Sequence, residues 1–305
     1  MRILLTGSSG QLGKAIISRK PNNVDLIEIN REKLDLENEQ QCEEIILRYR
    51  PDLLINCAAY TDVDKAEKEP KLAKSINSVA PKILSESLLK IGGKLIQIST
   101  DYVFNGQTNI AYDENSLRNP VNIYGSTKVG AEEAIQKIFN DSGDATIIRT
   151  SWLIGSYGNN FVDTMLELNE IKDEIRVVSD QIGSPTSIFS LSNVCWKIVD
   201  KFLINNSGAK LPSILHWSDA GIASWYDLAI SIADIALELG LIKKKARILP
   251  IYTNEYPRAA KRPPYSLLDS SKARKLLNIS STHWRHMLVE ILQKIKSSRN
   301  STKLK

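Results

Sequence analysis

Near its N-terminus the chain reads Arg2-Ile3-Leu4-Leu5-Thr6-Gly7-Ser8-Ser9-Gly10-Gln11-Leu12-Gly13, and this stretch decides the fold of the first half. The apolar run 2–6 is typical of a buried strand, and the pattern over 11–19 predicts a helix. Between such elements, the first glycine permits a sharp turn, the second lets the backbone approach a pyrophosphate, and the third allows close helix packing. Although the glycines are spaced three and three rather than two and three, the turn predicts dinucleotide binding at the helix N-terminus.

Beyond this turn, short apolar runs alternate with longer amphipathic stretches, a pattern typical of β-α-β units. Further strands are expected at 24–29, 52–57, 94–99 and 145–149, and helices at 37–49, 71–91 and about 122–139. The sequence therefore predicts an α/β fold with a Rossmann-like, doubly wound parallel sheet.

After residue 150 the alternation loosens, and prolines are expected to break 250–265 into loop. Helices are predicted at 160–170, 188–202, 224–239 and 283–297, with short strands near 175–178 and 214–217. We expect three parts: an NAD(P)-binding domain over 1–150, a smaller and partly discontinuous α/β substrate domain over 151–295, and a flexible basic tail over 296–305. Some segments of the second part are expected to return to the first.

The composition is that of a globular protein, with 305 residues, 42% hydrophobic and 25% charged. No apolar run is long enough to span a membrane, and the N-terminal run is too short for a secretory signal. The three cysteines have neither disulfide nor zinc spacing. Basic and acidic residues are mixed, so nucleic-acid binding is not expected from the net charge of +5. A cytoplasmic protein is predicted.

The end of the second predicted strand bears on the choice of cofactor. An acidic residue there binds the ribose of NAD, whereas an arginine accommodates the extra phosphate of NADP. The chain has Asn30-Arg31 at this place and no carboxylate before Glu32. NADP(H) is therefore favoured over NAD(H), although Arg31 would also fit a solvated surface charge.

The segment Tyr124-Gly125-Ser126-Thr127-Lys128 opens the helix predicted after the fourth strand. A spacing of four puts Tyr124 and Lys128 on one helix face. A nearby ammonium is expected to lower the pKa of the phenol toward the range of efficient acid–base work. The same spacing also arises by chance on amphipathic helices.

Thr100 lies at the carboxyl end of the fourth strand, where open parallel sheets bind their ligands. Its hydroxyl would reach a substrate oxygen beside Tyr124. Alternatively, Ser99 and Asp101 form a capping motif that simply satisfies the backbone.

Together these elements resemble an extended short-chain dehydrogenase/reductase. The detailed sequences of the motifs resemble the dTDP-4-dehydrorhamnose reductase family. The resemblance spans about residues 1–295 in order. It is carried by the stretches Leu5 to Gly13, Asn56 to Thr61, Val63 to Glu67, Ser99 to Phe104, Asn122 to Lys128, Arg149 to Trp152, Gly158 to Phe161, Asp180 to Thr186, and Arg262-Pro263 with Ser266 and Asp269.

The resemblance implies an enzyme that uses NADPH or NADH to reduce the C4 ketone of dTDP-4-dehydro-β-L-rhamnose, with Thr100, Tyr124 and Lys128 as catalytic residues. At the cofactor we expect, besides Tyr124 and Lys128, the residues Gly7, Ser9, Gly10, Gln11, Leu12, Gly13, Asn30, Arg31, Asp35, Leu36, Ala58, Ala59, Tyr60 and Ser99. At the nucleotide-sugar substrate we expect Asp101, Tyr102, Val103, Phe104, Trp152, Asn160 and Arg262. Trp152 would equally suit the core, and Arg262 a surface ion pair.

One departure concerns metal. Some relatives place a glutamate just after the glycine turn that helps to hold magnesium at a dimer interface, whereas this chain has Lys14-Ala15. No metal site is therefore predicted; magnesium is left open without support from the sequence, and so is a homodimer. The alternatives are another nucleotide-sugar 4-ketoreductase, an epimerase, or a non-catalytic relative resembling the regulatory subunit of methionine adenosyltransferase.

Overall fold

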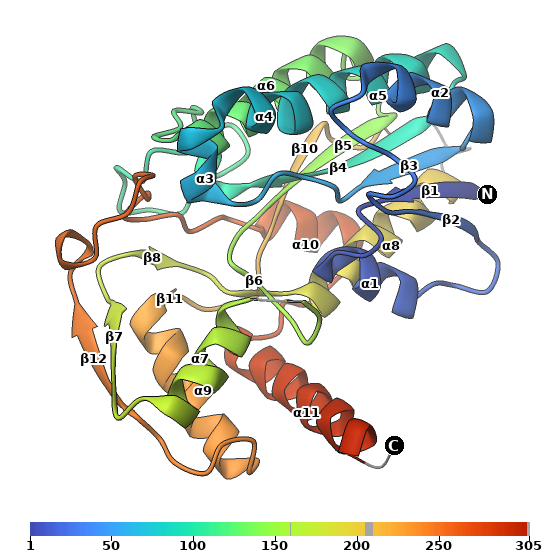
Figure 1. Cartoon of the computed structure of the whole chain (residues 1–305). Coiled ribbons are helices and arrows are strands. Elements are labelled where there is room, and N and C mark those ends of the chain that lie inside the picture. Colours follow the sequence, from blue (N-terminus) through green and yellow to red (C-terminus); the bar gives the residue numbers. More distant parts are fainter. Residues whose placement is uncertain (159, 205–209, 304–305) are drawn as a thin grey trace.

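A six-stranded parallel sheet forms the centre of the protein (Figure 1). The structure, a computed structural model, describes residues 1–158, 160–204 and 210–303. The strand order is β10-β5-β4-β3-β1-β2, so the sheet has the predicted doubly wound, Rossmann-like arrangement. Its strands are β1 (Arg2–Thr6), β2 (Asp25–Ile29), β3 (Leu53–Asn56), β4 (Lys94–Thr100), β5 (Ala145–Thr150) and β10 (Ile214–Trp217).

Helices cover both faces of this sheet, which explains why its strands read as continuous apolar runs. In β1, Leu4 packs toward the helices on one face, whereas Ile3 and Leu5 pack toward those on the other. The first group is α2 (Glu39–Tyr49), α5 (Ala80–Lys90) and α6 (Ile123–Phe139). The second group is α1 (Gln11–Ser18), α8 (Ile188–Ile204) and α10 (Ser271–Leu277).

The order of the strands reverses at β1, because β2 pairs with one side of β1 and β3 with the other. Ligands of open parallel sheets bind beyond the carboxyl ends of the strands at such a switch point. Gly7 follows β1 and Cys57 follows β3 there.

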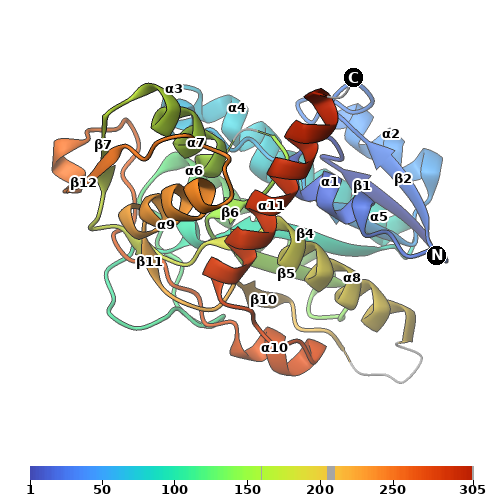
Figure 2. The same ribbon diagram turned by 90° about the horizontal axis from the view of Figure 1, so that it is seen from below.

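A smaller lobe lies below the sheet in Figure 1 and has a hydrophobic core of its own. Its helices are α7 (Phe161–Ile171), α9 (Trp225–Glu238) and α11 (Trp284–Lys303), and Figure 2 shows α11 lying between α9 and α1. Its paired strands are β7 (Glu174–Val178) with β12 (Arg247–Ile251), β6 (Leu153–Ile154) with β9 (Thr186–Ser187), and β8 (Ile182–Gly183) with β11 (Ala223–Ser224). The lobe is discontinuous in sequence, since α8, β10 and α10 belong to the sheet layers.

Several elements differ from the sequence-based expectation. The expected loop over 250–265 begins inside β12, where Pro250 is tolerated because β12 has only one neighbour, β7. The helix expected over 71–91 consists of α4 (Pro70–Lys74), a π-helical turn η1 (Ser75–Val79) and α5. Helix α11 continues to Lys303 and so includes most of the expected basic tail. Two further elements, α3 (Val63–Lys68) and a 3₁₀ turn η2 (Asp101–Val103), follow the carboxyl ends of β3 and β4.

Among the described residues, no helix is both long and apolar enough to cross a bilayer.

Candidate active site

The glycine turn forms a tight cradle at the switch point. Gly7 has a φ of +68°, and a Cβ there would lie 2.7 Å from the backbone N of Ala58 after β3. A Cβ on Gly13 would lie 2.2 Å from the carbonyl oxygen of Gly7. The first and third glycines are therefore required by the close packing of backbone on backbone.

The N-terminus of α1 opens into this cradle. Its N-cap is Gly10, and no side chain caps its free N–H groups. Ser9 and Gly10 are exposed, and the Gln11 Oε1 atom is buried without a hydrogen-bond partner. Uncapped N–H groups at a helix N-terminus fit a bound pyrophosphate. Leu12, by contrast, packs into the core, so only its backbone faces the cradle.

The residues after β2 lie at the surface. The Asn30 side chain accepts a hydrogen bond from the Lys33 N–H (3.2 Å). Arg31 is exposed, and within the described part of the chain its guanidinium has no hydrogen-bond or ion-pair partner. Asp35 is exposed and Leu36 is half-buried. The free guanidinium is therefore available to bind a phosphate.

The segment after β3 is fixed by a residue that the sequence interpretation missed. Asn77, on the π-helical turn η1, accepts a hydrogen bond from the Tyr60 N–H (2.8 Å) and donates one to the Thr127 hydroxyl (3.1 Å). Ala58, Ala59 and Tyr60 are thereby held beside α6, each half-buried. π-helical turns occur often at functional sites, but nothing in the sequence predicts this one.

Tyr124 lies in the first turn of α6, whose N-terminus is capped by the Asn122 side chain on the Gly125 N–H (2.7 Å). Burial raises the pKa of Tyr124 to about 12; the hydroxyl of Thr100 opposes this rise and the Asp101 carboxylate adds to it. The structure therefore brings Thr100 and Tyr124 together at the carboxyl end of β4. At neutral pH the phenol carries its proton, as a proton donor must.

Lys128 lies one turn further along α6 and is only 3% exposed. Its Nζ atom donates a hydrogen bond to the carbonyl oxygen of Ile98 in β4 (2.7 Å). Burial lowers the pKa of Lys128 to about 8, against the opposing effects of Glu132 and Cys57. The expected lowering of the Tyr124 pKa by this ammonium is wrong, because the ammonium binds β4 and burial of the phenol raises that pKa instead.

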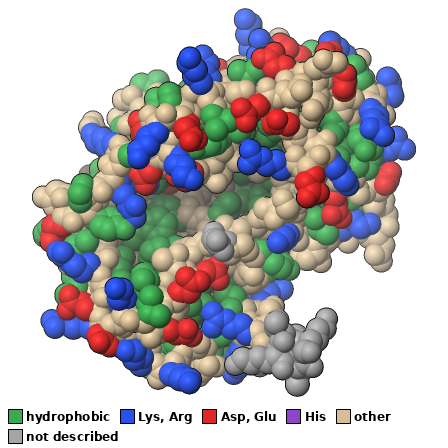
Figure 3. Space-filling view, in the orientation of Figure 1, with side chains coloured by type: hydrophobic (Ala, Val, Ile, Leu, Met, Phe, Trp, Pro, Cys, Tyr) green, Lys and Arg blue, Asp and Glu red, His purple; other side chains and the backbone are tan. Residues whose placement is uncertain are grey.

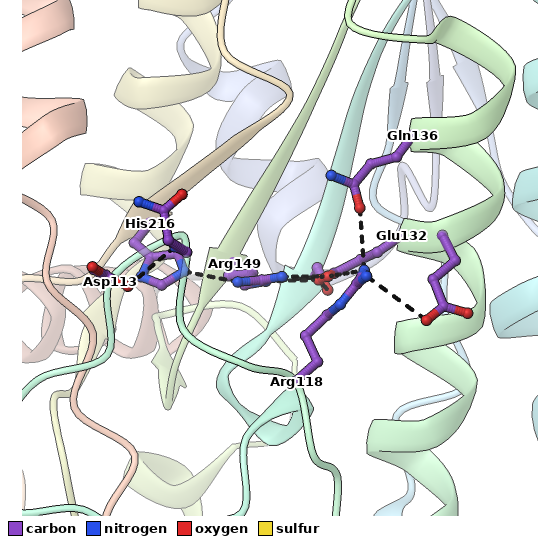
Figure 4. Close-up of polar contacts among 9 residues, drawn as sticks. Asp113, Arg118, Glu132, Gln136, Arg149 and His216 are labelled. Carbon is purple, nitrogen blue, oxygen red and sulfur yellow. Dashed lines mark hydrogen bonds and ion pairs between the residues drawn. The ribbon is translucent and has the colours of Figure 1, made fainter.

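A largely buried charged network ties α6 to the sheet. Figure 4 shows its members Arg118, Glu132, Arg149 and His216, and Ser99 also belongs to it. Glu132 accepts hydrogen bonds from Arg149 Nε (3.0 Å), Arg149 Nη2 (2.7 Å) and the Ser99 hydroxyl (2.6 Å). Arg149 Nη1 lies 3.3 Å from His216 Nε2, and Arg118 Nη1 lies 3.4 Å from Glu132 Oε2. Burial and the Arg149 cation lower the pKa of His216 to about 3, so this imidazole is neutral.

This Glu132 network changes the interpretation of Ser99. Its hydroxyl was expected at the cofactor but is committed to Glu132 inside the protein. The sequence interpretation missed Glu132, although it lies four residues after Lys128 and therefore on the same face of α6.

Two of the four residues expected at the substrate after Thr100 are fully buried. Val103 and Phe104 are both 0% exposed, and Phe104 stacks on Tyr112 with ring centroids 4.1 Å apart. Their side chains pack inside the protein against the loop 105–121, so contact of these two residues with a substrate is left to their backbone.

The other two residues lie closer to the phenol. The Tyr102 ring packs edge-on against Tyr124, with centroids 5.8 Å apart. Asp101 accepts a hydrogen bond from the Thr100 hydroxyl (3.0 Å), and burial raises its pKa to about 6. Its Oδ2 atom is buried without a hydrogen-bond partner.

Trp152 is held in an unusual conformation after β5. Its φ is +44°, a strained value for a bulky residue, and its ring stacks on Trp225 with centroids 3.8 Å apart and an interplanar angle of 6°. On Gly183, an added Cβ would lie 2.7 Å from the Trp152 ring. The half-buried indole is thus fixed between α9 and β8. Trp225 was not anticipated, because stacking across 73 residues leaves no local sequence signal.

Asn160 and Arg262 are occupied by contacts within the protein. Asn160 caps α7 by accepting from the Val162 N–H (2.9 Å), and its amide donates to Gly155 O (3.0 Å) and Asp163 Oδ2 (2.8 Å). Arg262 forms a two-pronged ion pair with Asp64. The Asn160 amide and both terminal nitrogens of Arg262 are therefore engaged within the protein. The neighbouring Asn159 lies outside the described residues.

Figure 3 shows a hollow between the sheet layers and the smaller lobe, with hydrophobic side chains on its wall and charged side chains around its rim. Within the described ranges, no group of three or more His, Cys, Asp and Glu side chains could hold a metal ion.

Comparison with known proteins identifies the family. A family model described as "RmlD substrate binding domain" matches residues 1–297. The chain belongs to the RmlD substrate binding domain family. The resemblance to dTDP-4-dehydrorhamnose reductases found in the sequence is therefore confirmed.

RmlD-family relatives match this chain over nearly its whole length. It is 38% identical to the spore coat polysaccharide biosynthesis protein SpsK of Bacillus subtilis, over 97% of this chain and 99% of the relative. It is 35% identical to dTDP-4-dehydrorhamnose reductase of Aggregatibacter actinomycetemcomitans, over 95% of this chain and 98% of that protein. The structure of dTDP-4-dehydrorhamnose reductase from Bacillus anthracis in complex with NADP matches with a TM-score of 0.86 and 36% identity, over 96% of this chain and 99% of that one.

Proposed function

We propose that this RmlD-family protein reduces the C4 ketone of dTDP-4-dehydro-β-L-rhamnose to dTDP-L-rhamnose, with NADPH preferred over NADH. The observation that carries this proposal is the Tyr124 phenol, which is held protonated beside the Thr100 hydroxyl at the carboxyl end of β4. The relatives named dTDP-4-dehydrorhamnose reductase support the choice of substrate.

The residues of the chain divide the work of this reaction. The cradle at Gly7 and the N-terminus of α1 bind the pyrophosphate of the cofactor. When bound, the reduced nicotinamide of that cofactor supplies the hydride. The Thr100 hydroxyl exchanges its hydrogen bond to Asp101 for one to the ketone oxygen, which it orients. Tyr124 gives its proton to that oxygen as negative charge develops there, a contribution of about 10²–10⁴-fold. Lys128 adds a positive charge beside the nicotinamide ribose.

On this proposal residues 1–150 bind mainly the dinucleotide, and residues 151–295 bind mainly the nucleotide sugar. Trp152 offers the sugar a broad apolar face, a role that its rigid stacking on Trp225 supports.

The direct test follows the absorbance of reduced nicotinamide with dTDP-4-dehydro-L-rhamnose present and absent. Substrate-dependent loss of NADPH with formation of dTDP-L-rhamnose is expected. Product with no net loss of reductant would instead indicate an epimerase, and reduction of a different 4-ketosugar another ketoreductase. Binding of NADP(H) without turnover of any ketosugar would indicate a non-catalytic relative.

The rate of reduction is expected to fall as the pH rises above about 8. Lys128 is cationic below its pKa of about 8 and neutral above it, while Tyr124 keeps its proton until about pH 12. A pH profile of kcat/KM tests this. In the Lys128→Arg variant the guanidinium stays charged, so this decline should disappear; a decline at the same pH in that variant would assign it to another group.

Replacing Arg31 is expected to weaken NADPH binding about tenfold and to leave NADH binding nearly unchanged, because only NADPH has a phosphate for the guanidinium. Michaelis constants for both cofactors measure the effect. Lys33→Ala, two residues further on, is the control for loss of one nearby positive charge. An unchanged preference in Arg31→Ala would assign the choice of cofactor to other residues.

A further inference from the structure

A segment of the chain, residues 257–266, crosses from the smaller lobe to the sheet layers; we call it the strap. In Figure 1 it runs between β12 and α10 and passes beside α3. Arg262 in the strap binds Asp64 of α3 with both prongs, Nη1 to Oδ1 at 3.1 Å and Nη2 to Oδ2 at 2.9 Å. The Ala260 N–H donates to the same carboxylate (3.0 Å). Asp64 therefore holds the strap by a side chain and by the backbone.

This ion pair is partly shielded from water. The Arg262 and Asp64 side chains are 18% and 29% exposed. Burial opposes ionisation of Asp64, but the hydrogen bonds from Arg262 and Ala260 keep its pKa below the usual value. A two-pronged, partly buried pair is stronger and more directional than a pair at the open surface.

Helix α3 and the strap also hold the first turn of α6, which carries Tyr124. Glu67, one turn after Asp64, accepts a hydrogen bond from the Ile123 N–H (2.8 Å). The Asn122 side chain, which caps α6, donates to the carbonyl oxygen of Lys261 in the strap (2.8 Å). The strap, α3 and the start of α6 thus form a closed ring of contacts next to the phenol.

The far end of the strap binds the segment that packs against Trp152. The Ile182 N–H donates to Pro264 O (2.8 Å), and the Ser266 N–H donates to Ile182 O (2.8 Å). The next residue, Gly183, packs directly against the Trp152 ring. One continuous segment therefore connects the backbone beside Tyr124 to the backbone beside Trp152.

We propose that Asp64 is a positioning residue for the reduction. By holding Arg262 and the strap, it fixes the distance between Tyr124 and Trp152, the residue whose apolar face we assign to the sugar. Arg262 then acts through Asp64 and not as a ligand of the substrate diphosphate. This inference rests on the proposed function. If Asp64 instead competed with a diphosphate for Arg262, removing its charge would tighten the binding of dTDP.

The test is Asp64→Asn, which keeps the shape of the side chain and removes its charge. The expected result is a loss of kcat/KM for dTDP-4-dehydro-L-rhamnose of roughly five- to tenfold, with little change in the Kd of NADPH. The Kd of dTDP, measured by calorimetry, should stay the same or rise. Tighter binding of dTDP by this variant would mean that the guanidinium had been freed for phosphate, and would overturn the proposal.

Asp62→Asn is the matched control, since Asp62 caps the same helix, is exposed and does not contact the strap. It should leave kcat/KM within about twofold of the wild type, as exposed charges usually do. Equal losses in Asp62→Asn and Asp64→Asn would show an effect of charge alone and would overturn the proposal.

Hydrogen exchange provides a measurement that does not depend on the reaction. In Asp64→Asn, the amides of the strap and of Ile123 and Ile182 should exchange faster, while those of β1 should not change. Unchanged exchange would contradict the positioning role even if no substrate is turned over. Absence of turnover in the wild type, with faster exchange in the variant, would contradict only the proposed function.

Discussion

Tyr124→Phe is expected to lower kcat roughly a hundredfold or more and to leave the Kd of NADPH nearly unchanged. The variant removes only the phenol oxygen, so the edge-on contact with Tyr102 and the fold of α6 remain. What it loses is the proton, which Tyr124 retains at neutral pH because burial raises its pKa to about 12. Steady-state kinetics with dTDP-4-dehydro-L-rhamnose, together with titration of NADPH fluorescence, measures both quantities.

Tyr49→Phe is a suitable control, because Tyr49 is a half-buried tyrosine of α2 on another part of the sheet. Its turnover should match the wild type within about twofold. Near-wild-type turnover of Tyr124→Phe would mean that the proton comes from another group. Asp101 would then be the next residue to examine, since its buried carboxyl has a pKa of about 6 and bonds to Thr100.

The sheet and the glycine cradle could be predicted from the sequence because their causes are local. Strands buried on both faces read as apolar runs, and the close approach of Gly7 to Ala58 accepts only glycine. The position of Thr100 at the end of β4 follows from the same alternation. Which half of the fold β10 would join could not be predicted, since four buried residues in a row specify a strand but not its neighbour.

The parts of the site that could not be predicted depend on contacts between distant segments. Arg262 and Asp64 are 198 residues apart, and nothing in either motif favours their pairing over a diphosphate ligand. Asn160 matches a family motif, but its amide caps α7. The pKa of Tyr124 was predicted to be lowered, whereas it is raised. Spacing along a helix indicates that Lys128 lies nearby, but it does not indicate that the phenol is buried.

The Glu132 network leads to the largest expected effect on stability. Glu132→Gln should lower the free energy of unfolding by about 3–5 kcal/mol, because it leaves the Arg149 guanidinium buried without a charged partner. Both side chains are at most 1% exposed. Urea denaturation measures the effect. Glu133→Gln is the matched control on the next residue of α6; its side chain is 62% exposed, and a change within about 0.5 kcal/mol is expected.

A second variant separates the destabilisation caused by an unpaired buried charge from the loss of the hydrogen bonds that orient α6. In the double variant Glu132→Gln with Arg149→Met, no charge is left unpaired between the two positions, so stability should recover in part. The recovered fold would still lack the charged hydrogen bonds between Glu132 of α6 and Arg149 of β5, and turnover should stay reduced because Tyr124 and Lys128 lie on the same helix. If Glu132→Gln were as stable as Glu133→Gln, the network would contribute nothing to the folding of this site. If the double variant instead recovered both stability and turnover, packing alone would suffice to orient α6.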